Sequence, residues 1–121
     1  MLQDLKKDKI KIGVVTARYR NTTKLIMDER GWNDFFDALI VGDEVGKPKP
    51  SPMPFEIAIK KIGVKPRECL VVGDGCYDMI SGRAAGCKTC RALYGYGGKE
   101  PCAAKADFEI NSLKEVLKIV L

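Results

Sequence analysis

Short apolar runs alternate with helix-like segments along the whole chain, and this order restricts the folds open to it. The alternation predicts a mostly parallel α/β sheet with helices on both faces, in a single domain of 121 residues. In such sheets, ligands bind beyond the carboxyl ends of the strands. The apolar runs are residues 11–15 (KIGVV), 38–41 (ALIV), 69–73 (CLVVG), 88–93 (KTCRAL) and 107–110 (DFEI).

The segments between these runs carry helix start and stop signals. Ser51 is suited to cap a helix that has Pro52 at its first position, and Gly63 is suited to end it. Gly31 and Gly86 end two other expected helices in the same way. The four predicted helices are residues 21–30, 52–62, 77–85 and 112–121.

Composition and charge narrow the class of protein. No apolar run approaches the ~18 residues of a membrane span, and the charged first residues lack a signal-peptide pattern, so we expect a cytoplasmic protein with no membrane partner. The net charge of +5 is spread along the chain without interleaved aromatic residues. This pattern favours a solvated surface that attracts phosphorylated substrates, and a basic nucleic-acid module is the weaker alternative.

The five cysteines are expected to be reduced thiols in a chain without an export signal. Cys87 and Cys90 have C-x-x-C spacing, but they fall on an expected strand, where residues three apart point to opposite faces. The chain has no histidine and no second C-x-x-C, so the sequence does not favour a zinc site.

Two aspartates follow the apolar run at residues 69–73. Asp74 comes directly after the run, and Asp78 lies about one helical turn further on. Carboxylate oxygens at this edge suit magnesium, which would also cancel the repulsion between the two acids. The same residues fit a simpler interpretation: Asp74 belongs to a Gly-Asp-Gly turn, and Asp78 is a favourable acid in the first turn of a helix.

Three other polar features lie near the expected strand ends. Thr16 ends the run at 11–15, where its hydroxyl and the next backbone N–H could hold a phosphoryl oxygen. Lys47 lies in a proline-rich loop, GKPKPSP, and could offset phosphate charge. Each also fits an ordinary role, as a strand-end threonine and a solvated connector. Arg18 and Arg20 could meet a phosphate, but we expect them to face water.

Taken together in this order, Thr16, the Lys47 loop and the VVGDGCYDM segment resemble motifs two to four of the haloacid dehalogenase superfamily, in its phosphoglycolate phosphatase-like branch. The resemblance implies a Rossmann-like three-layer α/β/α core and magnesium-dependent hydrolysis of small phosphate monoesters. It also implies that Thr16 and the Ala17 N–H bind the phosphoryl group, and that Lys47 steadies its charge. Asp74 and Asp78 would hold the metal.

The family's first motif, an Asp-x-Asp after a central strand, is absent from these residues. Asp4 and Asp8 are four apart in a charged, helix-like stretch, so neither is a credible nucleophile. The helical cap is missing too, so we expect a truncated core domain over residues 1–121. Magnesium binding should then be weak or absent, because two of the family's metal contacts lie in the missing segment.

The missing strand leaves three arrangements for the runs at 11–15 and 69–73. They could pair directly, take a strand from a partner, or leave two open edges that invite association. We expect one of the first two, and the edge argument favours a homodimer. Two functions are therefore open. One is a phosphatase core that is inactive without a separate segment or subunit carrying Asp-x-Asp; the alternative is a catalytically dead module that binds a phosphorylated ligand or a protein.

Overall fold

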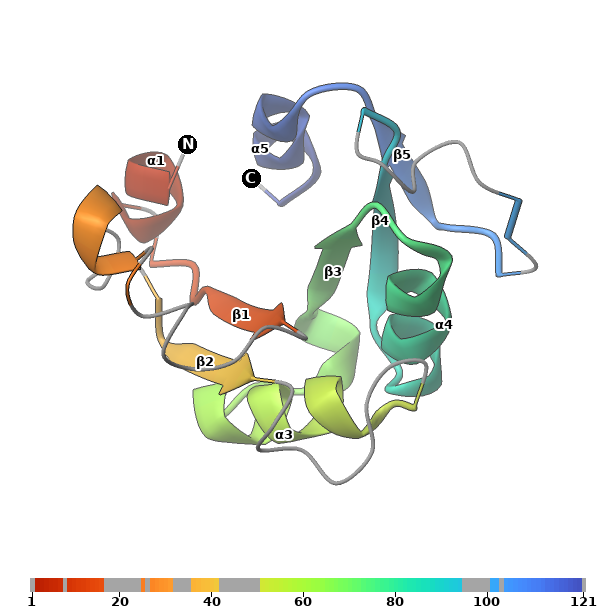
Figure 1. Ribbon diagram of the computed structural model, residues 1–121, viewed down its shortest axis with the longest axis horizontal. Coiled ribbons are helices and arrows are strands. Elements are labelled where there is room, and N and C mark those ends of the chain that lie inside the picture. The colour runs from red at the N-terminus through yellow and green to blue at the C-terminus, as the bar shows by residue number, and fades with distance from the viewer. Residues whose placement is uncertain are drawn as a thin grey trace.

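The computed structural model (Figure 1) contains two sheets, each built of parallel strands. The two sheets lie side by side and are separated by a gap. In the first, β1 (Gly13–Thr16) pairs with β2 (Ala38–Val41). In the second, the order is β3 (Leu70–Gly73), β4 (Lys88–Ala92) and β5 (Phe108–Ile110). The structure describes residues 2–7, 9–16, 25, 27–31, 36–41, 51–94, 101–102 and 104–120.

The strand order confirms the expected sequence β2-β1 and β3-β4-β5, but it contradicts direct pairing of β1 with β3. Within the described residues, β1 pairs with β2, β3 pairs with β4, and no ladder joins the two sheets. The reason is spatial, because side chains of both strands line one cavity between the sheets. Within the described residues the edges of β1 and β3 that border this cavity carry no ladder, and a strand taken from a partner stays a prediction.

Helices flank the strands in the layered order that the alternation predicts. They are α1 (Leu2–Lys7), α3 (Met53–Ile62), α4 (Cys76–Ala84) and α5 (Val116–Val120), with 3-10 turns η3 (Pro66–Glu68) and η4 (Leu113–Glu115). Residues 27–30 are also helical, and Gly31 follows them with a positive φ of 66°, as its stop signal predicts. The closing helix is shorter than expected, because 113–115 form a 3-10 turn first.

Local signals explain where α3 begins and ends. The helix begins at Met53, one residue later than expected, so Pro52 and not Ser51 is its N-cap residue; the Ser51 hydroxyl still accepts a hydrogen bond from the Met53 N–H at 3.2 Å. Gly63 ends it with φ 81° and donates its N–H to the Ile59 carbonyl at 2.9 Å. This left-handed conformation is one that glycine adopts without steric cost.

Two apolar clusters lie on opposite faces of the β3-β4-β5 sheet. Val71 and Cys87 pack with Ile59 of α3 on one face. Cys90 packs with Ile110 and Val116 on the other, next to α5. The two cysteines of the C-x-x-C therefore belong to different clusters, in line with the expectation that residues three apart point to opposite faces.

The first sheet is anchored to α1 through Asp37. Its carboxylate accepts hydrogen bonds from the Lys6 ammonium and the Ile12 N–H, each at 2.7 Å. The hydrogen bond from Lys6 is the largest influence on Asp37 and holds the pKa of its carboxyl below the ordinary value. This ion pair joins the helix, the start of β1 and the residue before β2.

A disulfide joins Cys76, the first residue of α4, to Cys102. The expectation that all five cysteines are free thiols is therefore wrong for this pair, while Cys69, Cys87 and Cys90 are free. The Cα atoms of Cys76 and Cys102 are 5.3 Å apart, within the range that disulfides span. The chain order does not reveal this proximity, because 26 positions separate the two residues.

Among the described helices, none has the length and apolar character that crossing a membrane requires.

Candidate active site at the carboxyl end of β3

The carboxylate of Asp78 lies against the backbone of the strand-to-helix turn. A Cβ placed on Gly73, the last residue of β3, would lie 2.5 Å from Asp78 Oδ2 and 2.7 Å from its Cγ. A Cβ on Gly75 would lie 3.5 Å from the same oxygen. Only a residue without a side chain leaves room for a carboxylate at this distance from Gly73. The glycine before Asp74 thus has a specific role, which is to admit Asp78 to the end of the strand.

Helix α4 begins directly after this turn. Gly75 is its N-cap in an extended conformation, and no side chain caps the helix. Asp78 lies in the first turn, where a negative charge interacts favourably with the helix dipole. Asp78 can therefore be a favourable acid in the first turn of α4 and also a ligand for magnesium, since one carboxylate can serve both roles.

The Asp74 backbone is held from β4. Arg91 donates from Nε to the Asp74 carbonyl oxygen at 3.3 Å. Tyr94 lies nearby: its pKa is raised first by burial and then by the negative charges of Cys90, Asp74 and Glu115. The turn after β3 is thus braced by a cation from the neighbouring strand and lies close to a phenol.

The other predicted site residues are only partly placed. Thr16 is half-buried at the end of β1, and its neighbour Val15 lines the cavity between the sheets. Ala17 and Lys47 lie outside the described residues, as do Arg18 and Arg20. The structure therefore places the two carboxylates and Thr16 at strand ends but does not test the phosphate-binding set.

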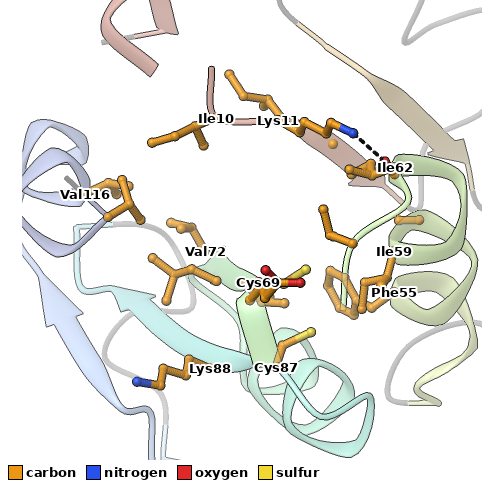
Figure 2. A pocket seen from close by; sticks show the side chains of 18 of the residues that line it. Ile10, Lys11, Phe55, Ile59, Ile62, Cys69, Val72, Cys87, Lys88 and Val116 are labelled. Atoms are coloured by element: carbon orange, nitrogen blue, oxygen red, sulfur yellow. Dashed lines mark hydrogen bonds between the residues drawn. The ribbon is translucent and has the colours of Figure 1, made fainter. Parts of the chain in front are cut away.

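A large cavity, which we call the central groove, separates the two sheets (Figure 2). Its volume is about 780 Å³, far above the ~30 Å³ that one water occupies in the liquid. Asp78 is among its lining residues, so the carboxylate held against Gly73 opens into this space. Most of the residues that line it are apolar, and many of them belong to β1, β3, α3 and α5.

The donor set fits magnesium in kind but supplies only part of a shell. Asp74 and Asp78 offer hard carboxylate oxygens, and magnesium commonly takes one or two protein carboxylates, with water and phosphate oxygens completing the shell. In the part of the chain that the structure describes, no group of three or more His, Cys, Asp or Glu side chains is arranged to hold a metal. The two acids therefore suit a metal site to which other groups also contribute ligands better than a site formed by these two residues alone.

The sequence profile of haloacid dehalogenase-like hydrolases matches residues 1–92, about three quarters of the chain. This chain belongs to that family. Among curated relatives of this haloacid dehalogenase-like chain, pyrophosphatase PpaX from Bacillus cereus strain AH820 is 34% identical over 120 residues. That alignment covers 98% of this chain and 56% of the relative. The Bacillus pumilus PpaX is 34% identical over 111 residues, covering 91% of this chain and 51% of the relative.

Solved structures of haloacid dehalogenase-like proteins superpose on almost the whole of this chain. A protein from Haemophilus somnus 129PT, described as a predicted phosphoglycolate phosphatase, superposes with a TM-score of 0.91 at 30% identity. The match covers 99% of this chain and 54% of that one. A phosphatase of the same superfamily from Thermococcus onnurineus gives 0.86 at 31% identity, over 98% and 54% of the two chains. The chain therefore spans about half the length of the relatives it matches.

Three features of the site were not found from the sequence. Arg91 reaches the Asp74 carbonyl from the neighbouring strand, and the Cys76–Cys102 disulfide closes over the start of α4. The contact of Gly73 with Asp78 is the third. A sequence signal exists for this last feature alone, since glycine directly before an acidic turn marks close approach to the backbone.

Proposed function

We propose that the chain is the magnesium- and phosphate-binding part of a phosphatase that acts on small phosphorylated metabolites and is inactive alone. The observation that carries the proposal is the Asp78 carboxylate, held against Gly73 and opening into the central groove, in a chain of this family. Phosphate monoesters such as phosphoglycolate, and pyrophosphate, are the candidate substrates, because the similar proteins carry these names.

Each predicted residue has a role in this proposal. Asp74 and Asp78 would hold Mg²⁺, which, when bound, neutralises charge on the transferred phosphoryl group. The Thr16 hydroxyl and the Ala17 N–H would orient the phosphoryl oxygens by donating hydrogen bonds. Lys47 would place an ammonium beside the same group, where it lowers the repulsion met by an attacking carboxylate.

The nucleophile is what these residues lack. The sequence has no Asp-x-Asp after an apolar strand, so a segment carrying that motif must complete the site before a phosphoryl group can be transferred. Two carboxylates alone would bind magnesium weakly. We therefore expect this chain alone to bind magnesium and phosphate weakly. Turnover is expected only in the completed protein.

The proposal places the protein in the cytoplasm, where phosphorylated metabolites are concentrated. Cytosolic reductants would then open the Cys76–Cys102 disulfide, since bonds of this kind persist mainly in oxidising compartments. Assays should accordingly be run in both redox states.

The test is phosphate release from p-nitrophenyl phosphate, phosphoglycolate and pyrophosphate in the presence of magnesium. The chain alone should show no turnover, and adding a polypeptide that carries the missing Asp-x-Asp strand should restore it. Asp74→Asn and Asp78→Asn should each lower the restored rate of phosphate release at least tenfold. Glu109→Gln, on an exposed strand residue, removes the same charge and should leave the activity unchanged.

Two results would contradict the proposal. Turnover by the chain alone that Asp74→Asn abolishes would reveal a nucleophile within these residues. Saturable binding of a phosphoester, with no turnover after the Asp-x-Asp polypeptide is added and shown to bind, would instead identify a catalytically dead ligand-binding module.

A further inference from the structure

We infer that the Cys76–Cys102 disulfide holds the Asp78 carboxylate in place for magnesium, so that the metal affinity of this chain depends on its redox state. The two cysteines are positioning residues in this inference, because they act through Asp78. The inference rests on the proposed function for the identity of the cation. Its evidence is the way in which the first turn of α4 is held.

The disulfide joins the chain between the two candidate metal ligands. Cys76 is the first residue of α4, and it lies between Asp74 and Asp78 in the sequence. Asp78 belongs to the same helical turn, and its carboxylate lies against Gly73. A restraint on the backbone of Cys76 therefore also restrains the turn that carries Asp78.

The first turn of α4 is weakly held by its own hydrogen bonds. Gly75 is the N-cap residue, and it has no side chain that could accept a hydrogen bond from the first N–H groups of the helix. The hydrogen bond from the Met79 N–H to the Gly75 carbonyl is 3.4 Å long, whereas about 2.9–3.0 Å is usual. A covalent bond at Cys76 therefore supplies a restraint that a capping side chain provides in other helices.

The remainder of α4 is held by contacts that do not involve the disulfide. Met79 and Ser81 are fully buried, and the Ser81 hydroxyl donates a hydrogen bond to the Ser51 carbonyl. Near the other end of the helix, Arg83 Nη1 donates to the Lys105 carbonyl at 3.1 Å. Loss of the disulfide should therefore loosen the first turn and leave the rest of the helix packed.

The other half of the disulfide belongs to a segment that is anchored to the second sheet. Cys102 precedes Asp107, which forms two hydrogen bonds with Thr89 of β4. The Thr89 N–H donates to Asp107 Oδ2 at 2.9 Å, and the Asp107 N–H donates to the Thr89 hydroxyl at 3.3 Å. A restraint positions a turn only if its far end is fixed, and this anchor meets that condition.

A dithiol reductant would convert the disulfide into two thiols. Two electrons and two protons pass from the reductant to the sulfur atoms of Cys76 and Cys102, the S–S bond breaks, and the reductant becomes a disulfide. Both cysteines are only half-buried, so a small reductant can reach the bond. In a reducing cytoplasm the chain would adopt the state of lower magnesium affinity, and oxidation would raise that affinity.

The experiment compares the oxidised full chain with the chain reduced by dithiothreitol, which is then removed in the absence of oxygen. Mg²⁺ alone is titrated into each, and the NMR signals of the Gly73, Gly75 and Asp78 amides are followed. Reduction should weaken Mg²⁺ binding about fivefold, roughly the effect of losing one helix cap. Hydrogen exchange of the Met79 amide should become faster on reduction, because its helical hydrogen bond opens more often.

Two variants separate positioning from a general effect on stability. Cys102→Ser removes the disulfide without changing the turn itself, and it should bind Mg²⁺ as weakly as the reduced chain, with or without reductant. Cys69→Ser removes a free thiol and keeps the disulfide, so it should respond to reductant as the parent chain does. All titrations are run where circular dichroism shows a folded chain, so a lower free energy of unfolding would by itself leave the affinity unchanged.

The outcomes separate this inference from the proposed function. Weaker Mg²⁺ binding on reduction and in Cys102→Ser supports the inference even if no phosphatase activity is ever restored. Equal affinity in the two redox states would overturn it, and so would a lack of Mg²⁺ binding in both. The proposed function is judged separately, by phosphate release after the Asp-x-Asp polypeptide is added.

Discussion

Helix α4 lies close to β3 at Gly82, and replacing this residue by alanine tests how the site is held. A Cβ on Gly82 would lie 2.9 Å from Val71 Cγ2, 3.0 Å from its Cβ and 3.2 Å from its Cγ1. Favourable carbon contacts lie at about 3.5–4.0 Å, so the added methyl must push the helix off the strand or distort Val71. Both residues are buried, which leaves little room for relaxation.

Two effects of opposite sign decide the magnitude. Alanine in place of glycine favours a helix by about 1 kcal/mol, whereas inserting a methyl into a packed interface costs about 1–3 kcal/mol. We therefore expect Gly82→Ala to lower the free energy of unfolding by about 1 kcal/mol. On a Val71→Ala background the two γ-methyl contacts are gone and only the contact with Cβ remains, so Gly82→Ala should cost less there than in the parent chain.

Urea unfolding of the four proteins in this double-mutant cycle measures the coupling between the two residues. The coupling should be about 1 kcal/mol or more, with the double variant more stable than the sum of the single changes predicts. Additive effects, or a Gly82→Ala protein that is as stable as the parent chain, would refute the view that this glycine sets the distance between α4 and β3.

Three other predictions follow from the cysteines and from Asp37. Reduction of the Cys76–Cys102 bond, which spans 26 positions, should lower the free energy of unfolding by about 3 kcal/mol, and the double serine variant should show no further effect of reductant. Burial, and after it the neighbouring Cys69 thiol, raises the pKa of Cys87 to about 11. Alkylation of Cys87 at pH 8, measured by mass spectrometry, should therefore be much slower in the native chain than in urea. Equal rates would show that the thiol is accessible. The pKa of Asp37 lies below its ordinary 3.8 in the folded state, so its stabilising contribution is present above that value and is lost as pH falls through the folded pKa. Asp37→Asn should therefore reduce the loss of unfolding free energy at acid pH. An unchanged pH dependence would show that the Lys6 contact is not maintained in solution.

The fold was largely predictable because its signals are local. Apolar runs and terminal glycines located the strands and the ends of the helices, and the parallel order followed from their alternation. The shortened closing helix was missed because residues 113–115 fit both a 3-10 turn and an α-helical turn. Glu115 stabilises this turn by accepting hydrogen bonds from the Asn111 and Ser112 N–H groups, which lowers the pKa of its carboxyl.

The site was predictable only where the strand ends define it. Asp74 and Asp78 were placed at the end of β3 because acids directly after an apolar run must lie at the sheet edge. The Arg91 contact and the Cys76–Cys102 bond depend on residues 17 and 26 positions apart, and no local pattern encodes those distances. Direct pairing of β1 with β3, one of the two expected arrangements, is wrong for the described residues, because a cavity lined by both strands lies between the sheets.

Helix α3 contacts β1 and β2 of the first sheet and also contacts α4, which covers the second. In addition, the Lys11 ammonium donates to the Ile62 carbonyl at its last turn, at 3.1 Å (Figure 2). In the part of the chain that the structure describes, the relative orientation of the two sheets is therefore set by helix and side-chain contacts, and no backbone ladder joins them. Side-chain packing fixes the separation of two sheets less rigidly than a ladder of backbone hydrogen bonds does, so we expect the width of the central groove to vary more than the strand spacing within either sheet.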